Sequence, residues 1–394
     1  MKNSDQNPIT CAHFPKCGGC TALNIPYSEQ LASKQKMLHN IFSSFNIDIP
    51  EITASPNPLY YRHKVQLPFG SFGKGQHRKI TLGCYALDSH NVIDQKECFV
   101  QDRDLTAIAH TIRRWAQKAG FQPYDERKGS GFLRHCLLRK GASTGEILVG
   151  LVTNGGRIPG SRNFARSLMD EAQKVISKNS QIIGVVQNVN TRSTNVVLGE
   201  HYEVWRGREF LKEKLGQYRF NVGLSTFFQV NPFAAPLLYN LVLEQIPQGS
   251  SVLDVYCGVG TITLWVSQKA SRVLGIEENR HSVREAIAAA RVNEVKNVKF
   301  LAGDASALLA ECTDDFNIAI VDPPRKGLEE RVINALKNSS VSKIIYVSCN
   351  PQSLLRDIKM LSPRFHLTSL KGVDMFAHTN HVECVAVLEA EYTV

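Results

Sequence analysis

The sequence predicts an α/β fold whose C-terminal part is built on a seven-stranded, mostly parallel sheet. From about Val222 onward, short apolar runs alternate with helical stretches, which is the pattern of βαβ units with a covered parallel sheet. The last two runs are separated only by FAHTN, which is too short for a helical crossover, so we expect them to pair antiparallel. The expected strands are, in order, SVLDVY, RVLGIE, VKFLAG, NIAIVD, KIIYVS, HLTSLKGVDM and HVECVAVLEA.

The preceding part of the chain has a mixed pattern. A compact Cys and Gly cluster at residues 11–20 is followed, after Pro26, by apolar residues at helical spacing. Residues 60–220 combine the strand-like runs GEILVGLV, QIIGVVQNV and TNVVLG with two expected helices, one from Leu105 to Gly120 and one over 164–175. We therefore expect a cysteine-cluster segment with its helix at 1–50, a central mixed α/β domain at 51–220 and the sheet domain at 221–394.

Charge is distributed unevenly between these parts. Residues 1–220 carry 30 Lys and Arg against 18 Asp and Glu, whereas residues 221–394 carry 16 against 18. A cationic part joined to a nearly neutral one suggests a polyanion partner, although charge that only keeps the protein soluble would look similar. The chain shows neither an apolar run of about 18 residues nor an apolar signal segment at its start. We expect a soluble, cytoplasmic monomer without membrane contact.

A glycine turn marks a predicted nucleotide site. In VLDVYCGVGTIT, Gly258 and Gly260 lie between a strand and a helix, where glycine lets the backbone approach a ligand closely. Glu277 ends the next strand and can accept hydrogen bonds from ribose hydroxyls, and Asp304 closes the third strand on the same edge. NAD remains open at this point, but Thr263 replaces the third glycine of dinucleotide binders, which favours adenosine without a pyrophosphate.

Two reactive side chains are expected at the carboxyl edge of the same sheet. Cys349 directly precedes Asn350, a typical helix N-cap, and Pro351, a typical first helical residue. A sulfur at a helix N-terminus favours the nucleophilic thiolate, and an inert buried thiol is the alternative. Glu383 begins the last strand at this edge, either as a base or as a structural ion-pair partner. Its neighbour Cys384 is assigned to the core.

The N-terminal cysteines indicate a metal site. Cys11, Cys17 and Cys20 lie within ten residues, and in a reducing compartment such clusters bind metal more often than they form disulfides. A fourth thiol would complete an all-cysteine site, and Cys98, in a polar stretch, is better placed than Cys84. Zinc and an iron–sulfur cluster both accept four thiolates, so the spacing leaves the metal open.

A thiolate and a carboxylate beside an adenosine site fit one reaction in particular. Thiolate attack at C6 of uracil makes C5 nucleophilic toward a sulfonium methyl group, after which the carboxylate removes the C5 proton and the thiolate leaves. A base within folded RNA must first be swung out of its stack.

The motifs YVSCNP, VLDVYCGVGT, DPPRKG and DMFAHTNHVECV closely resemble those of the RNA uracil-5-methyltransferase family, over nearly the whole chain. The resemblance implies a Rossmann-like methyltransferase domain that uses S-adenosylmethionine, with Cys349 as nucleophile and Glu383 as proton acceptor. It further implies a donor site lined by Gln229, Tyr256, Glu277, Asp304 and Asp322.

The cysteine spacing is similar to the [4Fe-4S] site of members that act on 23S ribosomal RNA. This implies an iron–sulfur cluster rather than zinc, 23S rRNA as the substrate, and the ligands Cys11, Cys17, Cys20 and Cys98. Ala377 and Thr261 depart from residues common in the family, and the N-terminal RNA-binding barrel of some relatives is not seen in the chain. We therefore expect the basic central domain to make a larger share of the RNA contacts.

Three alternatives remain. One is a tRNA uracil-5-methyltransferase. Another is a non-catalytic, metal-stapled RNA-binding or assembly factor, which intact Cys349 and Glu383 disfavour. Cytosine-C5 methylation is disfavoured because the similar family carries a cysteine after the double proline, where this chain has Arg325.

Overall fold

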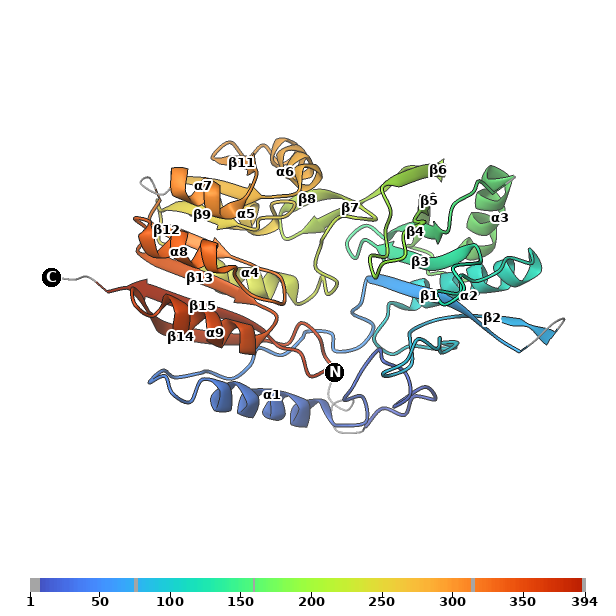
Figure 1. Ribbon diagram of the computed structural model, residues 1–394, viewed down its shortest axis with the longest axis horizontal. Helices are drawn as coiled ribbons and strands as arrows, with labels where there is room; N and C mark the ends of the chain where they lie inside the picture. The colour runs from blue at the N-terminus through green and yellow to red at the C-terminus, as the bar shows by residue number, and fades with distance from the viewer. Residues whose placement is uncertain (1–7, 74–76, 159, 313–315, 392–394) are drawn as a thin grey trace.

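The protein, described here by a computed structural model, contains two main sheets joined by a β-hairpin. The described residues are 8–73, 77–158, 160–312 and 316–391. In Figure 1 the C-terminal sheet and its helices occupy the left half and the central sheet the right half. Between them lies the hairpin of β7 (Phe210–Leu215) and β8 (Tyr218–Gly223). The boundary expected at residue 220 falls inside β8. No helix in the described ranges is long and apolar enough to cross a membrane.

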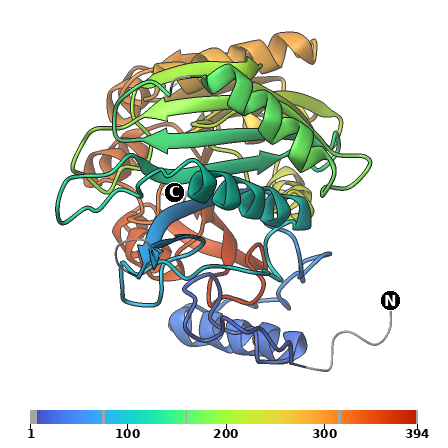
Figure 2. The ribbon, with the colours of Figure 1, turned by 90° about the vertical axis from the view of Figure 1, so that its right-hand side faces the viewer.

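The central domain is a mixed six-stranded sheet in the order β2-β1-β3-β4-β5-β6. Its only parallel pair among the described strands is β4 with β5. Two helices cover one face, seen in Figure 2 as the teal and green helices in front of the strands. The elements are β1 (Lys64–Phe72), β2 (Lys79–Leu82), α2 (Arg103–Lys118), β3 (Leu133–Lys140), β4 (Glu146–Thr153), α3 (Ser161–Gln173), β5 (Gln181–Val189) and β6 (His201–Gly207).

One strand predicted for this domain does not form. The run TNVVLG at 194–199 forms no strand, and β6 begins at His201. Side-chain amides replace a partner strand here: Asn190 Nδ2 donates to the carbonyls of Val196 and Val197, at 2.7 and 3.0 Å. Asn188 likewise donates to the carbonyl of Gly199. Such bonds compete with sheet pairing for the backbone groups.

The C-terminal domain has the expected seven-stranded sheet, in the order β11-β10-β9-β12-β13-β15-β14. Every neighbouring pair from β11 to β13 is parallel, and β15 runs antiparallel to both of its neighbours, as predicted from the short FAHTN connection. The elements are α4 (Ala235–Glu244), β9 (Ser251–Val255), α5 (Thr261–Val266), β10 (Arg272–Glu277), α6 (Arg280–Val292), β11 (Val298–Ala302), α7 (Ala305–Cys312), β12 (Ile318–Val321), α8 (Glu330–Asn338), β13 (Lys343–Ser348), α9 (Pro351–Leu361), β14 (Phe365–Val373) and β15 (Glu383–Ala390).

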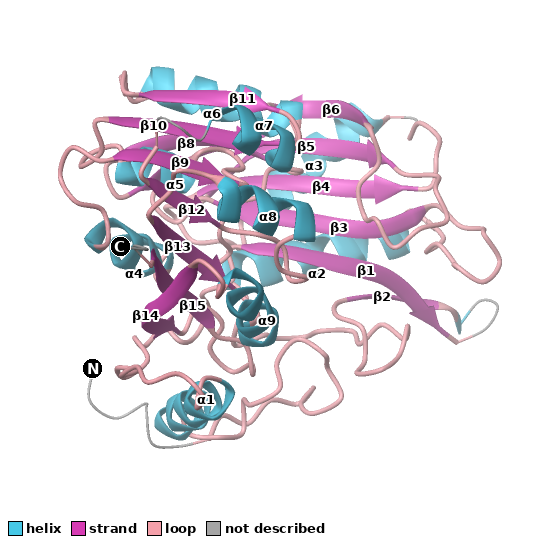
Figure 3. Cartoon of the chain, turned by 60° about the vertical axis from the view of Figure 1, so that its left-hand side comes forward, coloured by secondary structure: helices cyan, strands magenta, loops and turns pink. Residues whose placement is uncertain are grey.

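The helix of the N-terminal segment, α1 (Tyr27–Ile41), packs against the C-terminal domain. Leu38 and Phe42 share a hydrophobic core with Leu361 of α9 and Leu370 of β14. Figure 3 shows α1 below α9 at the foot of the sheet. The N-terminal segment is therefore packed, through α1, against α9 and β14 of the C-terminal domain.

Candidate active site

The glycine turn after β9 forms with strained backbone geometry. Tyr256, Gly258 and Gly260 have φ angles of 67°, 56° and 79°, which a non-glycine residue such as Tyr256 adopts only at a cost in free energy. Gly260 is the N-cap of α5. Thr263, at the position of the missing third glycine, donates from its hydroxyl to Asp254 at 2.5 Å. The threonine therefore ties the helix to the strand below it.

Glu277 is held at this turn by two backbone donors. Its carboxylate accepts from Gly258 N at 3.1 Å and from Asn279 N at 2.8 Å. The two bonds orient the carboxylate while leaving further lone pairs for a ligand. The ribose-binding role predicted for Glu277 remains a proposal.

The other acidic residues of the predicted donor site follow neighbouring strands. Asp304, after β11, accepts from Ser306 and forms an ion pair with Arg331 at 2.9 Å, and these partners lower the pKa of its carboxyl. Burial raises the pKa of Tyr256 to about 12, and the carboxylates of Glu329 and Asp304 contribute to this increase. Asp322 follows β12, and burial, with Asp254 nearby, raises the pKa of its carboxyl to about 7.

Gln229 lies in a different setting from these residues. It lines a small cavity with Lys64, Arg139 and Pro232, beside the β7–β8 hairpin. Within the described ranges, no hydrogen bond joins it to the other predicted donor residues. Its predicted donor contact remains a proposal.

Cys349 is placed as the sequence predicts but with a different electrostatic balance. It follows β13, and Asn350 caps α9 by accepting from Gln352 N at 3.1 Å. The expectation of a favoured thiolate is wrong in direction, because burial and the Glu383 carboxylate raise the pKa of the thiol, opposed by Arg325. Burial is the largest contribution to this raised pKa, and the carboxylates of Glu383 and Asp322 add to it.

Glu383 faces Cys349 through strand register. Ser348 of β13 is paired with Cys384 of β15, so continuing the antiparallel register by one position puts Cys349 opposite Glu383 and on the same face. Glu383 is 5% exposed, and burial with the nearby Asp322 raises the pKa of its carboxyl to about 8. Cys384 is fully buried, as predicted.

A cleft of about 620 Å³ opens beside Cys349. One wall is α1, which presents Lys36 and Asn40, and the other contains Arg325 and the start of α9. Asn350 Nδ2 donates to the carbonyl of Arg325 at 3.1 Å and so joins the DPPR loop to the helix. The α1 residues were not predicted to lie here, because only tertiary packing brings this helix to the cleft and its local sequence carries no signal of that placement.

The four predicted cysteine ligands line one small cavity in the N-terminal segment, together with Gln95 and Phe99; they are Cys11, Cys17, Cys20 and Cys98. Cys17 hydrogen-bonds Cys84, and this bond lowers its pKa to about 6. In the described part of the chain, no three Cys, His, Asp or Glu side chains are arranged to hold a metal ion. Four cysteine thiols are suitable ligands for an iron–sulfur cluster or zinc, but the described side chains are not arranged in a metal-binding geometry.

Comparison with known proteins gives consistent matches. Residues 162–391 match the family described as tRNA (Uracil-5-)-methyltransferase. A protein from Leptospira interrogans, named as an uncharacterized RNA methyltransferase, is 45% identical over 383 residues, covering 96% of this chain and 98% of that protein. A similarly named protein from Clostridium tetani is 36% identical over 387 residues, covering 96% and 82%.

A solved structure extends the likeness to the whole fold. The crystal structure of Pyrococcus abyssi tRNA (uracil-54, C5)-methyltransferase in complex with S-adenosyl-L-homocysteine superposes with a TM-score of 0.76 and 27% identity. The match covers 95% of this chain and 86% of that one.

Proposed function

The chain belongs to the tRNA (uracil-5-)-methyltransferase family, and from that membership we propose that it methylates C5 of a uridine in RNA, with Cys349 as nucleophile and Glu383 as base. It is an RNA methyltransferase, and S-adenosylmethionine is its methyl donor. The observation that supports the proposed mechanism is the register of β13 and β15, which puts Glu383 opposite Cys349; Cys349 also lines a cleft.

The proposed reaction balances with these two residues. The Cys349 thiolate bonds to C6 of the uracil, and the C5=C6 electron pair moves to form an enolate on O4. C5 then takes the methyl group of the donor sulfonium, whose sulfur–carbon bond breaks to leave S-adenosylhomocysteine. The Glu383 carboxylate removes the C5 proton, C5=C6 forms again and the thiolate leaves.

Both groups must be deprotonated before this sequence starts. Burial raises the pKa of both groups, with a further increase at Cys349 from the Glu383 carboxylate and at Glu383 from the Asp322 carboxylate. Deprotonating either group at neutral pH therefore costs free energy. The donor's positive sulfonium, placed beside them, favours both anions. The raised pKa also equips Glu383 to bind the C5 proton firmly once it has been taken.

We propose the donor contacts at Gln229, Tyr256, Glu277, Asp304 and Asp322, following the family motifs. The turn fits this group, because Glu277 is oriented by two backbone donors and the space beside Gly258 is open, with no atom within 4 Å of where a Cβ would lie. When bound there, S-adenosylmethionine supplies an electrophilic methyl group.

The substrate proposal is a uridine of 23S rRNA, supported by the four-cysteine segment. Transfer RNA is the second candidate, favoured by the likeness to the Pyrococcus abyssi enzyme. Unmodified 23S and tRNA transcripts are incubated separately with labelled S-adenosylmethionine, and nucleosides are identified by mass spectrometry. Label in 5-methyluridine from 23S RNA supports the first substrate, and label only from tRNA replaces it with the second.

Three variants test the mechanism in the same assay. Cys349→Ala should abolish methylation, whereas Cys384→Ala, the same change on the neighbouring strand, should retain it. Glu383→Gln should accumulate a covalent RNA adduct, because the thiolate cannot leave until the C5 proton is removed. Methylation by Cys349→Ala would refute the nucleophile, and no methylation of either RNA by a donor-binding wild type would favour the non-catalytic RNA-binding factor.

We also propose that Cys11, Cys17, Cys20 and Cys98 hold a [4Fe-4S] cluster, with zinc as the alternative. The supporting observation is that all four thiols line one cavity. Iron, zinc and sulfide are measured after anaerobic reconstitution of the wild type and of Cys17→Ser, with Cys84→Ser as the matched control. Equal metal content in wild type and Cys17→Ser would refute this ligand set.

A further inference from the structure

Helix α1 has two polar faces with different surroundings. Gln30, Lys34 and Leu38, four residues apart in turn, are buried. The adjacent stripe contains Ser33, Lys36, Met37 and Asn40, which line the cleft beside Cys349. Spacings of three and four residues place each set on one side of a helix. One side of α1 therefore anchors it, and the next side faces the cleft.

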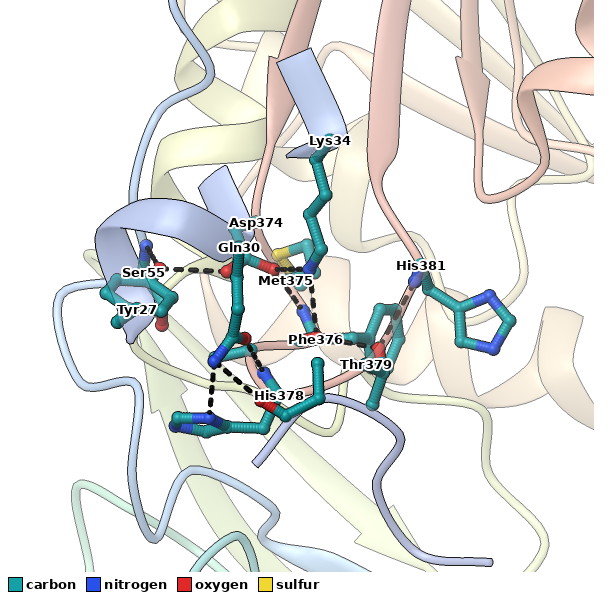
Figure 4. Close-up of polar contacts among 12 residues, drawn as sticks. Tyr27, Gln30, Lys34, Ser55, Asp374, Met375, Phe376, His378, Thr379 and His381 are labelled. Atoms are coloured by element: carbon teal, nitrogen blue, oxygen red, sulfur yellow. Dashed lines mark hydrogen bonds and ion pairs between the residues drawn. The ribbon is translucent and has the colours of Figure 1, made fainter. Parts of the chain in front are cut away.

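The anchoring side is tied to the loop that leads to Glu383. Lys34 Nζ lies 2.8 Å from Asp374 Oδ1 and donates to the Phe376 carbonyl at 3.2 Å. Gln30 Nε2 lies 3.0 Å from His378 Nδ1, and its Oε1 accepts from His378 N at 2.9 Å. Figure 4 shows these side chains reaching from α1 into the loop. Buried polar contacts of this kind fix the position of α1 relative to the catalytic strand.

Two cationic side chains line the cleft. Lys36 from α1 and Arg325 from the DPPR loop both line it, and both side chains are exposed. None of the described residues that line this cleft is Asp or Glu. Neither cation has an ion-pair partner within the described ranges. Asn380 and Gln352 add hydrogen-bonding groups between them.

We propose that α1 forms an RNA-binding wall, and that Lys36 contacts a phosphate next to the target nucleotide while Arg325 approaches the same strand from the opposite wall. This inference rests on the proposed function, since it takes the cleft at Cys349 to be the target site. A volume of about 620 Å³ is in the range that holds a nucleotide-sized ligand. Phosphate contacts position a strand without reading its sequence, so Lys36 contributes to affinity and placement rather than to base choice.

The test uses the full-length protein with its cleft intact. RNA affinity is measured for Lys36→Ala, Lys36→Arg and Lys36→Glu between about 50 and 200 mM salt. The matched control is Lys296→Ala, an exposed lysine in the loop between α6 and β11. Alanine suits a helix, so Lys36→Ala should fold normally. The RNA used is the transcript that the wild type methylates or, if neither is methylated, the unmodified 23S transcript.

We expect Lys36→Ala to bind RNA about 5- to 10-fold more weakly and to lower the salt slope by about one. Lys36→Arg should restore both, Lys36→Glu should bind still more weakly, and kcat at saturating RNA should change little. Affinity and salt slope equal to those of Lys296→Ala would overturn the inference. RNA affinity measured in a Cys349→Ala background tests the RNA-binding role of α1 even if no methylation occurs. Failure of this inference can therefore be distinguished from failure of the proposed methylation.

Discussion

Asp374→Asn should destabilise the protein strongly, because it leaves a buried lysine without its counter-charge. Asp374 is fully buried and Lys34 is 4% exposed, with 2.8 Å between Nζ and Oδ1. The same carboxylate accepts from the Tyr27 hydroxyl at 2.8 Å and from Phe376 N at 3.2 Å. The substitution preserves shape and removes only the charge and one acceptor.

Removing one partner of such a buried pair costs about 3–5 kcal/mol, because the remaining ion is neither solvated nor paired. Glu329→Gln is a matched comparison. Its partner Lys326 also lies 2.8 Å away, but the two side chains are 39% and 66% exposed, so we expect little change in stability. Burial is the main difference between the two pairs; in addition, Asp374 accepts from Tyr27 and Phe376, and Glu329 forms a second ion pair with Arg331.

The measurement is urea unfolding, with limited proteolysis of α1 as a local readout. Asp374→Asn should unfold at clearly lower urea and expose α1 to cleavage, and Asp374→Asn with Lys34→Met should recover most of the loss because no lone charge remains. If Asp374→Asn and Glu329→Gln unfold at the same urea concentration, the reasoning about this pair is refuted.

Three further outcomes are expected. Glu383 must be a carboxylate to accept a proton, and its pKa is raised to about 8, so kcat should fall as the pH drops through that value. Arg325→Gln should move the midpoint of this pH profile higher, because Arg325 lowers the pKa of Glu383. An unchanged midpoint would contradict the assignment of this profile to Glu383. Gly260→Ala should weaken donor binding about 10-fold in calorimetry, because the alanine is strained at positive φ and its Cβ contacts the Phe300 ring. The control Gly120→Ala, which also has positive φ (70°) but no neighbouring atom within 4 Å, should bind the donor normally. Glu277→Gln should raise the donor Kd about 10- to 100-fold, as expected for loss of a charged hydrogen bond, with RNA affinity unchanged; an unchanged donor Kd would remove Glu277 from the site.

Features that depend on neighbouring residues could be predicted from the sequence. The alternating strands and helices of the C-terminal domain, and the antiparallel last strand, follow from run lengths and connection lengths. The cap at Asn350 and the positive φ at Gly258 follow from residue types with strong local preferences. Even the failed strand at 194–199 has a local cause, although only the structure shows that Asn190 binds its carbonyls.

The electrostatic state of Cys349 could not be predicted in this way. The local pattern showed a helix N-terminus, which lowers a thiol pKa. Burial raises it instead, and the carboxylates of Glu383 and Asp322, which come from other strands, add to this effect. Both the burial of the sulfur and the positions of these charges are properties of the assembled sheet.

The seven-strand pattern, the glycine turn and the candidate reacting residues could be predicted from the sequence, because each is encoded in a short stretch of chain. The position of α1 as a wall of the cleft at Cys349 could not be predicted in this way. That placement depends on Lys34 meeting Asp374, 340 positions apart, and on Leu38 entering the core of the C-terminal domain. Contacts at this separation carry no periodic signal, since they result from packing whole elements together rather than from the preferences of neighbouring residues.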